Sequence, residues 1–93
     1  MAQREARIDI YGRSYTIRSE EEEDYILRLA DYVDRKMRDV SQRSSVISSL
    51  NVSVLAALNI ADELFKLREQ AQAYDNLAEE KVSNLLNLLE KED

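Results

Sequence analysis

A run of five consecutive carboxylates at residues 20–24 is the part of this sequence best suited to bind a metal ion. The same run follows Ser19, and a Ser with Glu22 three residues later forms a capping box that opens a helix. Acidic side chains on a first helical turn are stabilised by the positive end of the helix dipole. Because the capping box and the dipole explain the run without a ligand, we predict no metal site, with a metal-binding cluster as the alternative.

The residue types that most often carry catalysis are missing, because the sequence has 0 His, 0 Cys and 1 Gly. A single Gly excludes a glycine-rich phosphate loop. Asn59 is the one polar residue inside the apolar run of residues 54–61, and its amide needs a hydrogen-bond partner if it is buried. We predict that Asn59 fixes helix register, and that the protein is not an enzyme, has no catalytic residues and binds no cofactor.

Length and charge narrow the class of protein further. A chain of 93 residues allows one domain, and a helix that takes about half of it leaves too little chain for a well-filled monomeric core, so partner chains are expected. The formal net charge is -6, and the second half of the chain is the more acidic half. We therefore expect no nucleic-acid partner, no membrane span or signal peptide, and a cytoplasmic location.

Two short segments alternate between apolar and polar residues on either side of Gly12, which predicts a β-hairpin over residues 6–18. We predict that Gly12 takes a positive φ at the first position of a type II′ turn, followed by Arg13. The predicted apolar face of the hairpin consists of Ala6, Ile8, Ile10, Tyr15 and Ile17. A two-stranded hairpin is marginal in water, so this face must lie on a helix or pair with a second chain.

An amphipathic helix is predicted over residues 20–40, followed by a serine-rich connector at residues 41–49. The predicted buried face of this helix consists of Tyr25, Ile26, Leu29, Ala30, Val33, Met37 and Val40. On the opposite side, charged pairs such as Asp34 and Arg38 stand four residues apart, as ion pairs on a helix surface do. Together, residues 1–49 are predicted to form an N-terminal head.

A helix of roughly 40 residues, about 60 Å long, is predicted over residues 50–93. Its first part is predicted to pack in the head, where Leu55 and Leu58 close the core, and the remainder is predicted to form a coiled-coil stalk. The alternative is that the apolar side of this helix lines a pocket or binds a cofactor. The residues predicted to mediate oligomerisation are Leu55, Leu58, Asn59, Ile60, Leu64, Leu67, Ala71, Tyr74, Ala78, Leu85 and Leu88.

Three segments in this order and spacing resemble the bacterial cell-division protein family ZapA: residues 8–15 (IDIYGRSY), residues 30–37 (ADYVDRKM) and residues 56–64 (AALNIADEL). The last of these is the strongest match. The resemblance covers the chain from Arg7 to about Leu67, and the tail matches only as a coiled coil. It implies an α+β fold in which a dimeric head, made of a hairpin and a helix, precedes one long helix.

The resemblance also implies a function. Members of that family bind filaments of the tubulin-like division protein FtsZ in the cytoplasm at mid-cell and bundle them, as homotetramers built from two dimers. Carried over by position, Arg13 and Arg43 are the residues that would contact FtsZ. For Arg13, the alternative is that it occupies the second position of the turn, which accepts many residue types, and points into solvent. For Arg43, the alternative is a solvated charge without a binding role. Ser44 and Ser45 make the connector less basic than in some relatives.

A different partner is the alternative at the level of function. A generic coiled-coil adaptor or regulatory subunit, with the head as its dimerisation module, accounts for the same hydrophobic pattern. The two readings differ in whether FtsZ is the partner.

Overall fold

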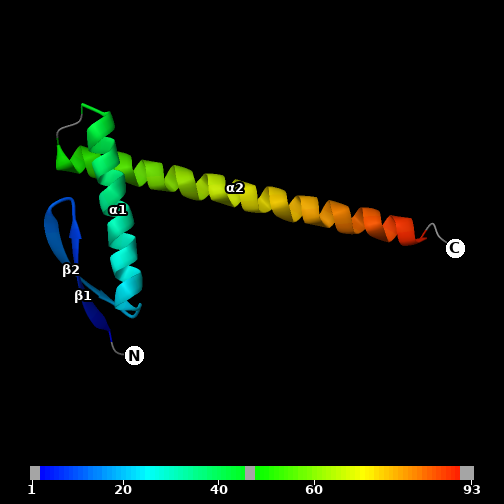
Figure 1. Ribbon diagram of the computed structural model, residues 1–93, viewed down its shortest axis with the longest axis horizontal. Coiled ribbons are helices and arrows are strands. Elements are labelled where there is room, and N and C mark those ends of the chain that lie inside the picture. Colours follow the sequence, from blue (N-terminus) through cyan, green and yellow to red (C-terminus); the bar gives the residue numbers. More distant parts are fainter. Residues whose placement is uncertain (1–2, 46–47, 91–93) are drawn as a thin grey trace. The chain divides into compact units, whose positions relative to one another are not determined.

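The computed structural model describes residues 3–45 and 48–90, which form a β-hairpin followed by two helices (Figure 1). The elements in chain order are β1 (Arg4–Ile10), β2 (Arg13–Ser19), α1 (Glu23–Arg43) and α2 (Ser49–Glu90). This order confirms the predicted α+β fold, in which a hairpin and a helix precede one long helix. Residues 1–2 of the predicted head, 46–47 of the predicted connector and 91–93 of the predicted long helix lie outside the described residues. No described helix contains an apolar stretch long enough to cross a membrane.

The chain divides into two compact units, residues 1–60 and residues 61–93. The first unit contains the hairpin, α1 and the start of α2. The second unit contains the rest of α2 up to Glu90. The predicted division into a head of residues 1–49 and a long helix of residues 50–93 stays a prediction, as does the stalk formed by the later part of that helix.

The hairpin turn differs from the predicted one by one residue. Ile10 pairs with Arg13 in the antiparallel ladder, so the two loop residues are Tyr11 and Gly12, with φ values of 51° and 79°. Positive φ at both central positions defines a type I′ turn, which matches the twist of the flanking strands. The predicted type II′ turn with Gly12 in first place is therefore wrong, because β1 continues through Ile10 and β2 begins at Arg13.

Helix α1 begins three residues later than predicted. Ser19 is still paired with Arg4 in the hairpin, and its hydroxyl accepts a hydrogen bond from the Glu21 N–H at 3.0 Å. A residue held in the strand ladder cannot also cap a helix, so the predicted capping box does not form. Glu22 occupies the N-cap position without a side-chain capping bond, and its carboxylate lies 2.7 Å from the Arg4 guanidinium instead.

The serine-rich connector is shorter than predicted, because α1 continues through Arg43 and residues 41–43 are helical. The Ser44 amide donates to the Val40 carbonyl at 3.1 Å and closes α1. The Ser48 hydroxyl accepts a hydrogen bond from the Asn51 N–H at 3.2 Å and caps the start of α2. Helix α2 begins at Ser49, one residue before the predicted helix of residues 50–93.

The buried side chains of the first unit form two clusters. One joins β1 to α1 and consists of Ala6, Ile8, Ile26 and Ala30. The other joins the end of α1 to the start of α2 and consists of Met37, Val40, Val52 and Ala56. Strand β2 adds no side chain to either cluster, so the hairpin covers α1 with one strand only.

Several residues predicted to be buried lie on the surface of the single chain. Val52 and Ala56 close the second cluster, with 0% and 1% of their surface exposed, whereas Leu55 and Leu58 lie on a neighbouring side of α2 and stay exposed. Helical phase explains the difference, because residues 52 and 56 share one side while 55 and 58 share the next. The other exposed members of the predicted core are Tyr15, Ile17, Tyr25 and Leu29.

The turn geometry generates a stability prediction at Gly12. A Cβ added there meets no atom within 4 Å, so any cost of Gly12→Ala comes from the backbone conformation and not from crowding. We expect Gly12→Ala to lower the free energy of unfolding by about 1 kcal/mol. Gly12→Asn should recover about half of that loss, because Asn tolerates positive φ better. Chemical denaturation followed by circular dichroism at one protein concentration measures both; two unchanged midpoints would contradict the turn.

Candidate protein-interaction site

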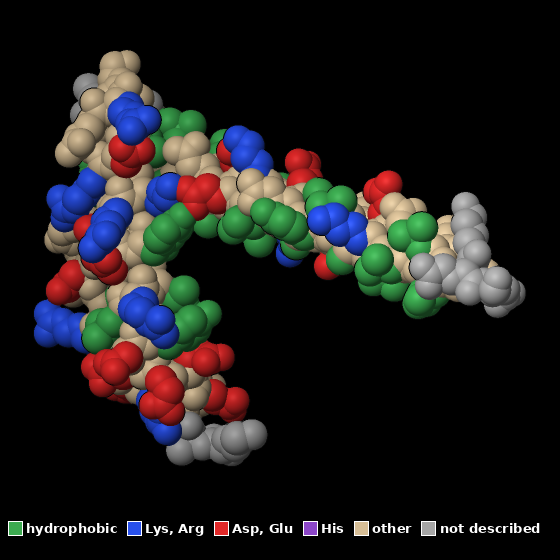
Figure 2. Space-filling view, turned by 45° about the vertical axis from the view of Figure 1, so that its right-hand side comes forward, with side chains coloured by type: hydrophobic (Ala, Val, Ile, Leu, Met, Phe, Trp, Pro, Cys, Tyr) green, Lys and Arg blue, Asp and Glu red, His purple; other side chains and the backbone are tan. Residues whose placement is uncertain are grey.

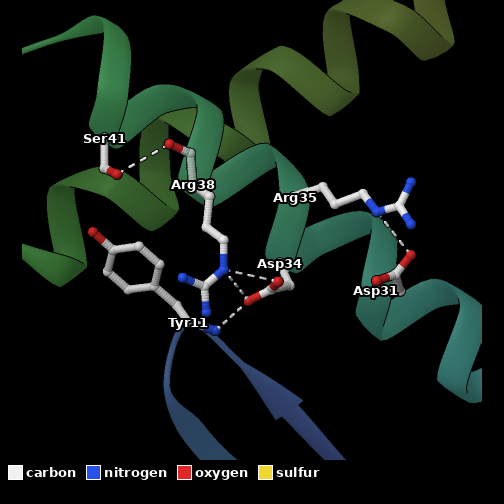
Figure 3. A network of polar contacts seen from close by, with 6 residues as sticks. All are labelled: Tyr11, Asp31, Asp34, Arg35, Arg38 and Ser41. Atoms are coloured by element: carbon white, nitrogen blue, oxygen red, sulfur yellow. Dashed lines mark hydrogen bonds and ion pairs between the residues drawn. The ribbon is translucent and has the colours of Figure 1, made fainter.

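The hairpin turn is fastened to α1 through one carboxylate (Figure 3). Asp34 accepts a hydrogen bond from the Tyr11 backbone N–H at 2.8 Å. The Arg38 Nε donates to both oxygens of the same carboxylate, at 3.2 and 3.0 Å, and its guanidinium lies 5.9 Å from the Tyr11 ring centroid. The two residues of α1 thus hold both the backbone and the ring of the first turn residue.

The charges of this network stabilise each other. The hydrogen bond from Arg38, followed by the one from the Tyr11 amide, lowers the pKa of Asp34 below its usual value. The same contact raises the pKa of Arg38. The side chain of Asp34 is 21% exposed, while that of Asp31, which pairs with Arg35 one turn earlier, is 56% exposed. The better-shielded pair is therefore the one that holds the turn.

A mostly apolar groove of about 460 Å³ lies beside the turn, within the first unit. Its walls come from the hairpin, from Met37 of α1 and from the start of α2. The lining residues are Ile8, Ile10, Tyr11, Arg13, Tyr15, Ile17, Met37, Ser49, Leu50 and Ser53. Leu50 is 71% exposed and Tyr15 is 47% exposed, so the groove is open to a partner's apolar side chains.

Arg13 lies on the rim of this groove. Arg13 is the first residue of β2 and pairs with Ile10. It therefore does not occupy the second position of the turn, as the alternative prediction proposed. Among the described residues, no carboxylate lies at ion-pair distance from Arg13. A cation beside an open apolar groove is suited to anchoring a carboxylate of a docked protein segment.

Arg43 lies elsewhere in the first unit. It is the last residue of α1 and forms an ion pair with Asp39 at 3.0 Å. With Leu55 and Asn59, it lines a shallow hollow of about 220 Å³ that is separate from the groove at Arg13. The structure therefore places the two candidate arginines at different hollows, and their contact with FtsZ stays a prediction.

The residues predicted to mediate oligomerisation lie on the surface of the single chain. In the first unit Leu55, Leu58 and Asn59 are exposed and Ile60 is half-buried. In the second unit the predicted residues, all exposed, are Leu64, Leu67, Ala71, Tyr74, Ala78, Leu85 and Leu88. The space-filling view shows hydrophobic side chains along α2 between charged ones (Figure 2). These residues are available for a seam, and their role in one stays a prediction.

The part of the chain that the structure describes shows no cluster of side chains placed to bind a metal ion. Within residues 3–45 and 48–90, no three or more His, Cys, Asp and Glu side chains are placed to hold a metal ion. In the same part of the chain, every buried side-chain nitrogen and oxygen has a hydrogen-bond partner.

Sequence reasoning missed the role of Asp34 in the turn. The four-residue spacing predicts its ion pair with Arg38 but not its bond to Tyr11, which is 23 residues away. The only available signal was the dipeptide Tyr11-Gly12, where a bulky residue precedes a turn Gly. A bulky residue at positive φ needs tertiary support, and Asp34 supplies it.

Comparison with known protein families gives one match to most of the chain. The family model described as "Cell division protein ZapA" matches residues 6–89. A cell division protein ZapA of Shouchella clausii is 38% identical over 65 residues, which cover 70% of this chain and 83% of the relative. One from Geobacillus thermodenitrificans is 42% identical over 71 residues, covering 76% and 75%.

Two solved structures resemble the fold. A conserved bacterial protein of unknown function from Pseudomonas aeruginosa aligns with a TM-score of 0.77 at 27% identity, covering 98% of this chain and 99% of the other. A structure described as a ZapA mutant dimer from Geobacillus stearothermophilus aligns with a TM-score of 0.65 at 30% identity, covering 85% and 92%.

The network at the turn predicts unequal costs for two similar substitutions. Asp34→Ala should lower the free energy of unfolding by about 1–2 kcal/mol, because it removes an acceptor from the Tyr11 amide as well as an ion pair. Asp31→Ala removes an exposed ion pair of the same spacing and should cost less than about 0.5 kcal/mol. Chemical denaturation of both variants at equal concentration measures this difference, and equal costs would contradict the network.

The same network predicts how the cost depends on pH. Because folding lowers the pKa of Asp34, its charged form contributes stability above the pKa of an unfolded Asp, about 4, and loses it as pH falls through the folded pKa. The stability difference between wild type and Asp34→Asn should therefore be largest near neutral pH and shrink in acid. A difference that grows in acid would reverse the sign and reject the assignment.

Proposed function

This chain belongs to the ZapA family of cell division proteins, and from that premise we propose that it is a non-enzymatic scaffold that binds FtsZ filaments and bundles them at the mid-cell division ring. The working form is a homotetramer assembled from two dimers in the cytoplasm. Each tetramer carries more than one filament-binding head, so it can hold two filaments together. Once one head is bound, the second binds at a raised effective concentration.

The exposed apolar surface of α2 is the observation that carries the proposal. From Leu64 to Leu89 the second unit is one helix, and its large hydrophobic residues are between 44% and 74% exposed. A soluble helix with such a stripe requires a partner helix. The relative from Geobacillus stearothermophilus is described as a dimer, which supports self-association of this chain.

In the proposed dimer, the second copy also fills the open groove of the first unit. A second copy that places apolar side chains on Tyr15, Ile17 and Leu50 buries surface that the single chain leaves exposed. Arg13 at the rim and Arg43 at the end of α1 remain as charges near the edge of such a contact. Both are proposed to bind carboxylates of the filament.

Filament binding is tested by sedimenting purified FtsZ with GTP in the presence and absence of this protein at low salt. We expect the protein to pellet with FtsZ and to increase bundling. Arg13→Glu should lower the pelleted amount roughly threefold or more, because it places a like charge against the filament. The matched control Arg68→Glu reverses a charge on α2 outside the proposed contact and should pellet like wild type.

Two outcomes would count against this proposal. Absence of co-pelleting by a folded, oligomeric protein would reject FtsZ as the partner and favour an adaptor with another partner. Equal pelleting of the Arg13→Glu and Arg68→Glu variants would reject the role of Arg13 alone.

The tetramer is tested at the C-terminal end of α2. Leu85→Glu together with Leu88→Glu places charge in the proposed seam, and we expect the mass measured by light scattering to fall to about half, that of a dimer. Asn84→Glu together with Asn87→Glu adds the same charge on the polar side of the helix and should leave the mass unchanged. An unchanged mass for the leucine variant would refute the seam.

A further inference from the structure

Arg13, which is proposed to bind FtsZ, lies in a weakly supported part of the hairpin. It is the first residue of β2 and pairs with Ile10 across the turn. Among the described residues, β2 adds no side chain to either buried cluster, and its connection to α1 runs through β1 and the turn. The orientation of Arg13 therefore depends on the conformation of the two turn residues that precede it.

The first turn residue, Tyr11, has a backbone conformation that a bulky residue does not favour. Its φ is 51°, in the left-handed region, where such a residue persists only when surrounding contacts hold it. The Tyr11 N–H donates to the Asp34 carboxylate at 2.8 Å, and the Arg38 guanidinium lies 5.9 Å from the Tyr11 ring centroid (Figure 3). Asp34 thus ties the backbone of the turn to α1.

Asp34 itself is poorly placed to contact a filament. Its carboxylate already accepts hydrogen bonds from the Tyr11 amide and, through both oxygens, from the Arg38 Nε. The side chain is only 21% exposed, and its negative charge would repel the carboxylates that Arg13 is proposed to bind. An effect of Asp34 on filament binding must therefore pass through the residues that it holds.

We propose that Asp34 is a positioning residue for the filament contact, because by holding the Tyr11 backbone it sets the direction in which Arg13 leaves the turn at the rim of the groove. This inference rests on the function proposed above and adds to it a residue that does not touch the filament. Without Asp34, Arg13 is still present but less ordered before binding. Ordering it then lowers the affinity.

A double-mutant cycle tests whether Asp34 acts through Arg13. Co-pelleting over a range of FtsZ concentrations with GTP gives an apparent Kd, at a temperature at which circular dichroism shows every variant to be folded. We expect Asp34→Ala to raise the Kd about threefold and Arg13→Ala about fivefold. The double variant should match Arg13→Ala within about 1.5-fold, because two residues that act as one unit are not additive.

Two further variants separate the tie to the turn from the loss of charge. Asp34→Asn keeps an oxygen that accepts from the Tyr11 amide but loses the charge that pairs with Arg38, and it should stay within about 1.5-fold of the wild-type Kd. Asp31→Ala removes the exposed ion pair with Arg35 on the same helix and should also bind within about 1.5-fold of wild type. A Kd for Asp34→Asn as high as that of Asp34→Ala would contradict the proposed role of the Tyr11 bond.

Hydrogen exchange measured by NMR examines the turn without FtsZ. The Tyr11 amide should be protected in wild type and in Asp34→Asn, and it should exchange about tenfold faster in Asp34→Ala. Equal exchange rates in wild type and Asp34→Ala would show that Asp34 does not hold the turn and would overturn the inference.

Failure of this inference is distinguishable from failure of the proposed function. If folded, oligomeric wild-type protein does not pellet with FtsZ, the proposed partner is wrong and the role of Asp34 in that contact is rejected with it. If wild type does pellet, an unchanged Kd for Asp34→Ala rejects the positioning role alone, and so does an additive cycle with Arg13. A lower mass of Asp34→Ala in light scattering would attribute its weaker binding to assembly and would also reject that role.

Discussion

The hydrogen bond from the Tyr11 amide to Asp34 fixes the part of the molecule on which the groove depends. A bulky residue at positive φ is unfavourable, and a turn at the tip of a two-stranded hairpin has few neighbours to hold it. Asp34 supplies the missing acceptor, and Arg38 holds Asp34 while covering the Tyr11 ring. The direction in which Arg13 leaves the turn, and the wall that Tyr11 gives to the groove, follow from these contacts.

A shortage of buried surface is the second constraint. Helix α2 takes 42 of the 93 residues, yet only Val52 and Ala56 of that helix are buried. The apolar side of β2 and most of α2 therefore remain exposed, and a monomer of this kind is marginal because little apolar area leaves water. In the assembly proposed above, a second copy supplies the missing burial, and folding of the first unit is then linked to assembly.

The sequence predicted the elements well and the residues that close the core poorly. Alternation around Gly12, helical spacing and a serine-rich break are local signals, so the hairpin, both helices and the connector between them could be predicted. The turn register, the start of α1 and the choice of Val52 over Leu55 depend on how elements meet, which local patterns do not record. Arg13 and Arg43 came from resemblance, and no local pattern showed that they lie at different hollows.

Helix α1 shows how a short chain can serve several contacts at once. One side packs on β1 and α2, a second carries Asp34 and Arg38 to the turn, and a third leaves Tyr32 exposed. Because the three sides share one rigid helix, their geometry relative to each other is set by helical phase alone. An insertion of one residue in α1 would rotate all residues after it by about 100° relative to those before it. The insertion would therefore disturb the contacts of all three sides at once, whereas a single substitution weakens one contact.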